Sequence, residues 1–206
     1  MQLYYAPGAC SLAPHIVGRE AGLALDLVKV DLAAKKTADG GDFYAINPKG
    51  YVPAIRLDNG EVLTEAANVV GYLAAQKPDS GLAPAAGGME RYRYQEWLTF
   101  VSSELHKGFG PLFNPKFSDD AKQVIKEKLA PRLAWLDKEL AGRQFLAGDR
   151  FSAADAYAFT ILRWANPLKV DLAAYPNIRA YMDRVGARPK VQEALRAEGL
   201  LETKAA

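Results

Sequence analysis

The sequence has only one cysteine, Cys10, and only two histidines, His15 and His106. A single cysteine can form neither an internal disulfide nor a Cys-x-x-Cys redox pair. A zinc site built from thiolate and imidazole ligands needs more of these residues than the chain contains. We therefore expect no bound metal, and any thiol chemistry at Cys10 requires an external thiol.

An excess of charge of either sign is also missing. Lys and Arg number 26 against 24 for Asp and Glu, and no run of basic residues is longer than Lys35-Lys36. Proteins that bind nucleic acids usually concentrate basic residues on one face. We therefore expect no nucleic-acid partner.

Long hydrophobic runs are absent as well. No segment approaches the ~20 apolar residues that span a bilayer, which argues against a membrane partner. Residues 1–18 contain no Asp, Glu, Lys or Arg, but Pro7, Gly8, Pro14 and His15 interrupt them and no basic leader precedes them. A secretion signal has a basic leader and an unbroken apolar core, so we expect a cytoplasmic protein.

What the chain does contain is an ordinary globular composition, with 50% apolar and 24% charged residues among 206. This length accommodates one large domain or two small ones. The first half alternates strand patterns with helical ones. We predict strands over 3–5, 25–31, 52–57 and 62–64, a hairpin turn at 58–60, and helices over 11–21 and 66–76.

The second half differs from the first. Residues 77–88, KPDSGLAPAAGG, are rich in Pro, Gly and Ala without periodicity, which is typical of a linker. The residues after it favour helices over 89–107, 119–141, 153–166, 177–186 and 189–198. The sequence therefore predicts an α/β domain over 1–77, a linker over 78–88 and an all-helical domain over 89–206.

Cys10 is the first candidate for chemistry, and two interpretations compete. A free cysteine is often a small buried core residue. Cys10 also stands at a predicted helix start, where free N–H groups and the helix dipole lower the pKa of a thiol. The turn at Pro7 and Gly8 just before it gives a ligand room to approach the backbone.

Two further segments carry weaker signals. Pro53 lacks a backbone N–H, so Val52-Pro53 fits either a sheet edge or a cis peptide bond. Glu65 and Ala66 stand at the start of a predicted helix, whose free N–H groups suit a carboxylate ligand. The structural alternative is that Glu65 only complements the helix dipole.

The order of these segments is more specific than any one of them. Tyr-x-x-Pro-Gly-x-Cys-Ser at 4–11, NPKGYVPAI at 47–55 and LDNGEVLTEA at 57–66 resemble the cytosolic glutathione transferases, with the closest similarity to the bacterial beta class. LHKGFGPLF at 105–113 and FLAGDRFSAADAYAF at 145–159 resemble stretches of the same family. Within the last stretch, Ser152 and Asp155 fit a helix capping box, which predicts a role in folding the domain.

The resemblance implies a thioredoxin-like N-terminal domain that binds glutathione as an added strand. Val52 would pair with the cysteinyl residue of glutathione next to a cis Pro53. Glu65 would hold the γ-glutamyl amine, and Ala66 with the helix start would hold its carboxylate. Lys35 would approach the glycyl carboxylate. Many family members have Ser at position 66, whose hydroxyl contact Ala66 cannot make.

In the helical domain the resemblance implies a second set of residues, some of them contributed by the partner subunit. Position 99 is commonly Asn in the beta class, so Thr99 departs from the pattern. A lone histidine in such a segment is more often a packed polar residue, but Ser103 and Lys107 beside it favour a ligand role for His106. The set that would line or approach the site is Thr99, Ser103, Glu104, His106 and Lys107.

The second substrate would lie against an aromatic wall, which suits hydrophobic electrophiles, although an aromatic stripe is more often plain core. The residues assigned to this wall are Pro7, Gly8, Phe109, Phe113, Phe117 and Trp164.

The resemblance thus implies a homodimeric glutathione transferase that conjugates glutathione to hydrophobic electrophiles, in detoxification, with Cys10 and His106 as catalytic residues. Two alternatives stay open. Cys10 can form a mixed disulfide with glutathione, which is the chemistry of a thiol reductase or peroxidase. The chain can also retain the fold as a glutathione-binding or scaffold protein without turnover.

Overall fold

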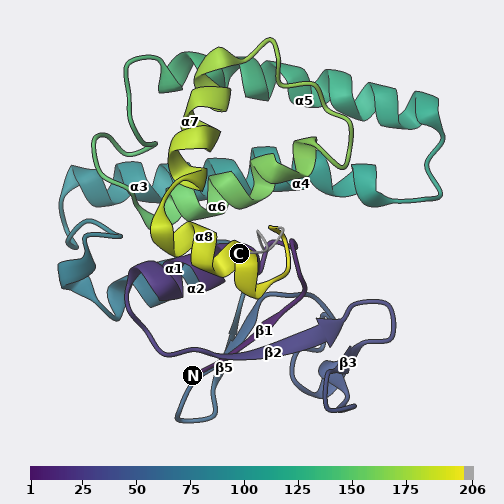
Figure 1. Ribbon diagram of the computed structural model, residues 1–206, viewed down its shortest axis with the longest axis vertical. Coiled ribbons are helices and arrows are strands. Elements are labelled where there is room, and N and C mark those ends of the chain that lie inside the picture. Colours follow the sequence, from purple (N-terminus) through teal and green to yellow (C-terminus); the bar gives the residue numbers. More distant parts are fainter. Residues whose placement is uncertain (202–206) are drawn as a thin grey trace, which may run out of the picture.

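In a computed structural model, which describes residues 1–201, the first part of the chain forms a five-stranded mixed sheet (Figure 1). The strand order is β3-β2-β1-β4-β5. Strand β1 pairs in parallel with β2, and the other pairs are antiparallel. The strands are β1 (Gln2–Tyr5), β2 (Asp26–Asp31), β3 (Lys36–Thr37), β4 (Ala54–Arg56) and β5 (Val62–Thr64).

The two faces of this sheet bury different residues because side chains alternate along each strand. Leu3 and Ile55 are fully buried in the large core that the helices share. Tyr4 and Ala54 point to the other face, where they pack with Phe43 from a short helical turn. The alternation therefore gives the sheet one face toward the helices and a smaller apolar cluster on the opposite side.

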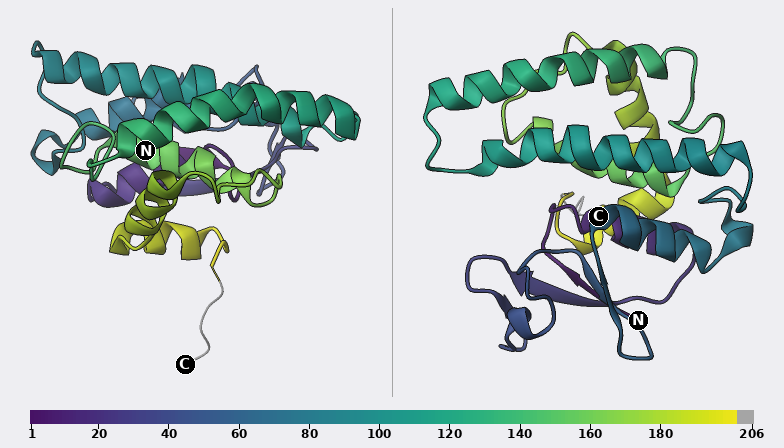
Figure 2. Two further views of the ribbon diagram at one scale, coloured as in Figure 1. Left: turned by 90° about the horizontal axis from the view of Figure 1, so that it is seen from above. Right: turned by 180° about the vertical axis from the view of Figure 1, so that it is seen from behind.

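Helices α1 (Leu12–Glu20) and α2 (Ala66–Ala75) lie between the sheet and the rest of the molecule. Viewed from behind, the same two helices separate the sheet from the long helices of the second part (Figure 2). Helix α1 packs against α2 and against α6 and α8 of the second part. Helix α1 is therefore packed against elements of both domains.

The second part is helical throughout, as the sequence predicts, and the α/β domain followed by a helical domain is confirmed. Its main helices are α3 (Met89–Phe100), α4 (Lys107–Phe109), α5 (Asp119–Leu140), α6 (Ala153–Leu162), α7 (Pro176–Gly186) and α8 (Pro189–Ala197). All ten residues of α6 are buried, which makes this helix the centre of the core. Within residues 1–201, no helix is both long and apolar enough to cross a membrane.

The capping box predicted at the start of α6 is present. The carboxylate of Asp155 accepts from the backbone N–H and the hydroxyl of Ser152, at 2.8 and 2.7 Å. The same carboxylate accepts from the backbone N–H of Leu146 at 2.8 Å and from the hydroxyl of Tyr181 at 3.2 Å. These hydrogen bonds connect the loop before α6, and helix α7, to helix α6.

Two features of the backbone depart from the expectations. Strand β3 lies between the predicted strands 25–31 and 52–57, where the sequence analysis predicts neither a strand nor a helix. The helix predicted over 89–107 changes to a π-helical turn over Val101–His106 before it continues as α4. A π-helical turn has more than 3.6 residues per turn, so α-helical spacing does not place residues 99, 103, 106 and 107 on one face of the helix.

Candidate active site

Cys10 lies in the loop between β1 and α1, and this loop is fixed by its own polar contacts. The buried hydroxyl of Ser11 accepts from the N–H of Ala6 at 3.1 Å and lies 3.2 Å from the carbonyl of Ala6. The thiol of Cys10 donates to the backbone carbonyl of Val52 at 3.1 Å. Two of the segments singled out in the sequence therefore meet directly.

The predicted low pKa of Cys10 is wrong for this state of the protein. The residue is 9% exposed, and burial raises the pKa of its thiol to about 12. The nearby negative charge of Glu65 raises the pKa further, whereas the backbone N–H groups of Cys10 and Ser11 lower it. The N–H groups at the helix start do act on the sulfur, but desolvation outweighs them.

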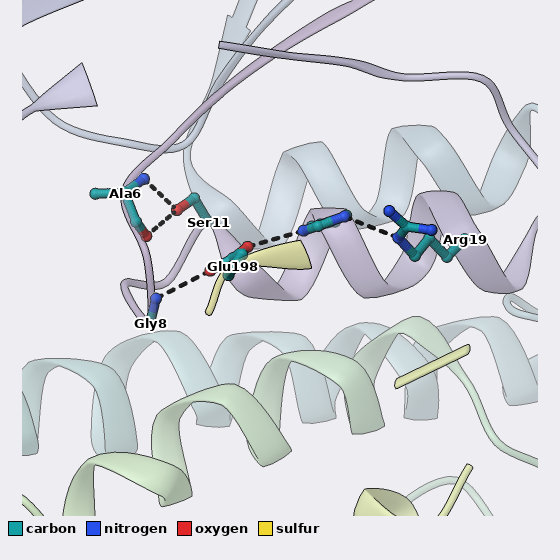
Figure 3. Close-up of polar contacts among 6 residues, drawn as sticks. Ala6, Gly8, Ser11, Arg19 and Glu198 are labelled. Atoms are coloured by element: carbon teal, nitrogen blue, oxygen red, sulfur yellow. Dashed lines mark hydrogen bonds and ion pairs between the residues drawn. The ribbon is translucent and has the colours of Figure 1, made fainter. Parts of the chain in front are cut away.

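The Cys10 loop is also held from the far end of the chain. Glu198, which follows α8, is buried, and its carboxylate accepts from the N–H of Gly8 at 2.9 Å. The other oxygen of Glu198 lies 2.8 Å from Nδ1 of His15, and Arg19 donates to Nε2 of the same ring at 2.9 Å. Figure 3 shows this line of contacts from Gly8 through Glu198 toward Arg19.

These contacts determine the tautomer of His15. The Nε–H of Arg19 can only donate, so Nε2 of His15 must accept. The proton of the neutral ring is therefore on Nδ1, which donates to Glu198. A neutral imidazole thus connects a buried carboxylate to a partly exposed guanidinium.

Trp164 reaches the same loop from the helical domain. Its indole N–H donates to the carbonyl of Gly8 at 2.9 Å. The ring of His106 lies edge-on to Trp164, with centroids 5.0 Å apart. Since Gly8 and Cys10 belong to one short loop, the structure places His106 and Trp164 beside the loop that carries the thiol.

His106 is the last residue of the π-helical turn, and its second contact is Tyr157 of α6. The phenolic oxygen of Tyr157 lies 2.6 Å from Nδ1 of His106. Burial lowers the pKa of His106 to about 4, and the positive charge of Lys107 lowers it too, against a smaller opposing effect of Glu65. His106 is therefore a neutral imidazole at physiological pH.

The Val52–Pro53 peptide bond is cis, as the resemblance implies. Glu65 stands at the start of α2 with a backbone φ of 68°, a region that residues other than glycine rarely adopt. Its side chain is 66% exposed and forms an ion pair with Lys49 at 2.6 Å. Lys49 also donates to the hydroxyl of Thr64 at 2.8 Å. The carboxylate of Glu65 is thus open to a ligand and already holds one ammonium group.

Lys35 lies in a neighbouring loop. Its ammonium group donates to the carbonyl of Gly50 at 2.9 Å and lies 5.9 Å from the ring centroid of Tyr51. Gly50 and Tyr51 directly precede Val52 in the sequence. The structure therefore brings Lys35 to the segment that ends in the cis bond.

The other predicted residues of the helical domain differ in their surroundings. Thr99, Ser103 and Lys107 are exposed. Glu104 forms an ion pair with Arg132 of α5 at 3.0 Å, so its carboxylate is directed to the helical domain. His106 is connected to the Cys10 loop through Trp164. The contacts described for these four side chains do not connect them to that loop.

The predicted aromatic wall needs one correction. Phe109 is fully buried in the main core and presents no surface to a ligand. Phe113 is half exposed and packs edge-on against Trp164, with ring centroids 5.1 Å apart. Phe117 and Pro7 are also exposed. Trp164 is itself only 8% exposed, so the apolar surface that remains beside Gly8 consists of Phe113 and the edge of Trp164, without Phe109.

Five residues around the site are not among those that the sequence predicts. Lys49 occurs in the motif at 47–55, but its pairing with Glu65 depends on the fold. His15 and Arg19 have the i, i+4 spacing of a helical pair. Tyr157 and Glu198 contact residues 51 and 190 positions away. Among residues 1–201, no group of three or more His, Cys, Asp or Glu side chains is arranged to hold a metal ion.

Two family models match the chain. The model described as glutathione S-transferase, N-terminal domain, matches residues 8–76. The model described as glutathione S-transferase, C-terminal domain, matches residues 100–189. The two matches cover most of the chain in the order of its two parts.

Individual relatives match over nearly the whole length. Glutathione S-transferase GstA of Escherichia coli O157:H7 is 46% identical, over 97% of this chain and 100% of the relative. A sphingomonad glutathione S-transferase solved in complex with glutathione is 52% identical, with a TM-score of 0.94 over 98% of this chain and 100% of the other. A beta-class glutathione S-transferase of Sphingomonas chungbukensis is 51% identical, with the same TM-score and coverage.

Proposed function

The chain belongs to the glutathione S-transferase family, and on this basis we propose that it transfers glutathione to small hydrophobic electrophiles. The observation that carries the proposal is the meeting of three segments. The thiol of Cys10 contacts the carbonyl of Val52 at 3.1 Å, and the charge of Glu65 acts on the same thiol. A ligand that pairs with Val52 and reaches Glu65 therefore lies beside Cys10.

Glutathione fits this arrangement as an extended peptide. Its cysteinyl residue would pair with the backbone of Val52, next to Pro53, by strand addition. Its γ-glutamyl ammonium group would replace that of Lys49 on the carboxylate of Glu65. Its γ-glutamyl carboxylate would accept from the N–H of Ala66 at the start of α2. Lys35 would approach the glycyl carboxylate.

The nucleophile in this proposal is the thiolate of glutathione. With its pKa near 12, Cys10 keeps its proton at physiological pH. Its S–H would turn from the carbonyl of Val52 to donate a hydrogen bond to the bound sulfur. The glutathione thiol would release its proton to solvent. Its sulfur would then form a bond to the electrophilic carbon, and a leaving group such as halide would depart with the bonding electron pair. Mixed-disulfide chemistry at Cys10 and a scaffold role are not favoured.

The helical domain would complete the site. His106 and Trp164 lie beside the Cys10 loop, and Phe113 extends the apolar wall for the electrophile together with Phe117, Pro7 and Gly8. Thr99, Ser103, Glu104 and Lys107 are retained as proposed glutathione contacts. Because three of the four are exposed, and Glu104 is paired with Arg132, these contacts would form when glutathione or a partner subunit is present.

We further propose a domain division and an assembly. The glutathione-binding domain would span residues 1–77, the linker 78–88 and the substrate domain 89–206, of which 202–206 lie outside the described residues. The end of α2 at Ala75 and the start of α3 at Met89 support this division. The protein would act as a beta-class homodimer in detoxification, in the cytoplasm, where thiols are kept reduced.

Conjugation of an activated aryl halide by the purified protein tests the proposal, beside disulfide and hydroperoxide reduction. We expect conjugation to be the main activity.

Glu65→Gln removes the charge that holds the γ-glutamyl amine, so the free energy of glutathione binding should become less favourable by about 1.5–3 kcal/mol. Calorimetry measures this loss, and Glu61→Gln on the exposed hairpin is the control. Equal affinity of the two variants would remove Glu65 from the site, and reduction without conjugation would overturn the proposed reaction.

A further inference from the structure

Tyr157 is buried behind His106 and has no role in the site described so far. It lies in the middle of α6 and is 1% exposed. Its ring stands edge-on to that of His106, at an interplanar angle of 88°. Its phenolic oxygen lies 2.6 Å from Nδ1 of His106. This bond determines which nitrogen of His106 carries the proton.

The phenol of Tyr157 is placed to donate in this bond. Among residues 1–201 the phenol has no hydrogen-bond partner other than His106, so its own hydrogen is directed to Nδ1 of His106. Burial raises the pKa of Tyr157, and this keeps the phenol protonated. Since Nδ1 accepts, the neutral ring carries its proton on Nε2.

The Nε2 atom is on the opposite side of the ring from Tyr157. No residue in the range 1–201 accepts a hydrogen bond from it. In the same range, the hydroxyl of Tyr94 is the only buried side-chain N or O atom that lacks a hydrogen-bond partner. Nε2 of His106 is therefore not fully buried. Nε2 therefore reaches solvent, while Trp164 packs on the ring and connects it to the carbonyl of Gly8.

We propose that Tyr157 is a positioning residue that fixes His106 in the Nε2–H tautomer, so that His106 donates a hydrogen bond to the thiolate of glutathione. The proposal rests on the proposed transferase function. His106 is a donor here and not a general base, because its accepting nitrogen is occupied by Tyr157. The charged groups that act on His106 are Lys107 beside it and Glu65 at the start of α2.

The two histidines of the chain provide an internal comparison. His15 is held as the Nδ1–H tautomer by Arg19 and Glu198, whereas His106 is assigned the Nε2–H tautomer. Ring nitrogen shifts in ¹⁵N NMR distinguish the two forms, and with two histidines the spectrum is simple. We expect two opposite patterns in the wild-type protein. A wild-type His106 in the Nδ1–H form would overturn the proposal.

Tyr157→Phe removes the hydroxyl and keeps the ring. We expect His106 to lose its single tautomer, and the signals of His15 to stay unchanged. The matched control is Tyr181→Phe, which removes another buried hydroxyl of the helical domain, bonded to Asp155. The control is expected to lower stability and leave both tautomers unchanged. Persistence of the Nε2–H form of His106 in Tyr157→Phe would show that Tyr157 does not set it.

Activity separates a positioning role from a structural one. In Tyr157→Phe, kcat/KM for conjugation should fall about tenfold. The titration of the bound glutathione thiol, followed by thiolate absorbance, should move up by about one pH unit. Unchanged titration would contradict donation to the thiolate. His106→Gln retains a donor near the place of Nε2, so it should keep about tenfold more activity than His106→Leu.

The outcomes also separate this inference from the proposed function. If the wild-type protein shows the Nε2–H form at His106 but conjugates no electrophile, the transferase function fails and the role assigned to Tyr157 in catalysis fails with it. If conjugation occurs and His106 is in the Nδ1–H form, the function stands and the inference about Tyr157 is wrong. Equal activity of His106→Gln and His106→Leu would likewise overturn donation by His106.

Discussion

Cys10 shows how burial reverses what a sequence position suggests. The residue does lie just before the first helix, and backbone N–H groups do lower its pKa, as expected at such a position. Its sulfur is nevertheless almost completely removed from water, and an unpaired thiolate there costs more than these donors return. The neutral thiol donates to the carbonyl of Val52 instead.

The reactivity of Cys10 should therefore rise with pH far beyond neutrality. Alkylation requires the thiolate, and a pKa near 12 makes the thiolate scarce at pH 7. We expect the alkylation rate at pH 7 to be about a hundredfold or more below that of the protein unfolded in urea. Because the chain has one cysteine, intact mass after timed exposure to iodoacetamide measures Cys10 alone. A rate that levels off near pH 7 in the folded protein would contradict the raised pKa.

Site residues differ in how far the sequence could predict them. Cys10, Val52 and Glu65 occur in short motifs with turn and helix-start signals, and the structure brings these three together. Tyr157 and Glu198 act through contacts across 51 and 190 positions. A local pattern carries no information on such contacts, since they depend on how helices from different parts of the chain pack.

At the scale of secondary-structure elements, the sequence predicts correctly those features that have a strong local signal. The capping box of Ser152 and Asp155 has a fixed spacing and is confirmed at the start of α6. The π-helical turn over Val101–His106 has no such signature. It was missed because its sequence is compatible with an ordinary helix, and packing decides between the two. This turn is what places His106, so a precise site could not be derived from the spacing alone.

The contact between the end of α8 and the start of α1 has consequences for the Cys10 loop. Glu198 accepts from the N–H of Gly8 and from His15 while it is buried. In Glu198→Gln, one of the two acceptor oxygens becomes an N–H donor, so one buried partner loses its bond. We expect the free energy of unfolding to fall by about 1–3 kcal/mol. We also expect Cys10 to be alkylated faster, because the loop that carries it loses its anchor.

Chemical denaturation and timed alkylation measure these two effects. The control is Glu139→Gln in helix α5, where the side chain is partly exposed and pairs with Arg143 at 3.4 Å, outside the contacts of Glu198. Exposed ion pairs contribute little to stability, so the control should change the free energy of unfolding by less than about 0.5 kcal/mol. Equal effects of the two variants would show that Glu198 does not anchor the loop.

At the scale of the whole molecule, helix α3 leaves one side uncovered. Six of its residues and of the following turn are exposed and recur at helical spacing, namely Met89, Tyr92, Arg93, Glu96, Thr99 and Ser103. Met89 and Tyr92, which are 69% and 61% exposed, add large apolar side chains to this stripe. This stripe supports the proposed homodimer, in which one surface would pair with its own copy around a two-fold axis.

A charge on the apolar part of the stripe should separate the subunits. Tyr92→Lys places like charges near each other across a two-fold interface, so it should shift the protein from dimer to monomer at micromolar concentration. Sedimentation velocity over a range of concentrations measures this shift, and conjugation assays at the same concentrations show whether activity follows it. The control is Val124→Lys, which adds the same charge at a half-exposed residue of α5 outside the stripe.

Since Thr99 and Ser103 belong both to the stripe and to the proposed glutathione contacts, conjugation activity should fall as the dimer dissociates. A wild-type monomer with full specific activity at micromolar concentration would contradict both the dimer and the sharing of the site between subunits.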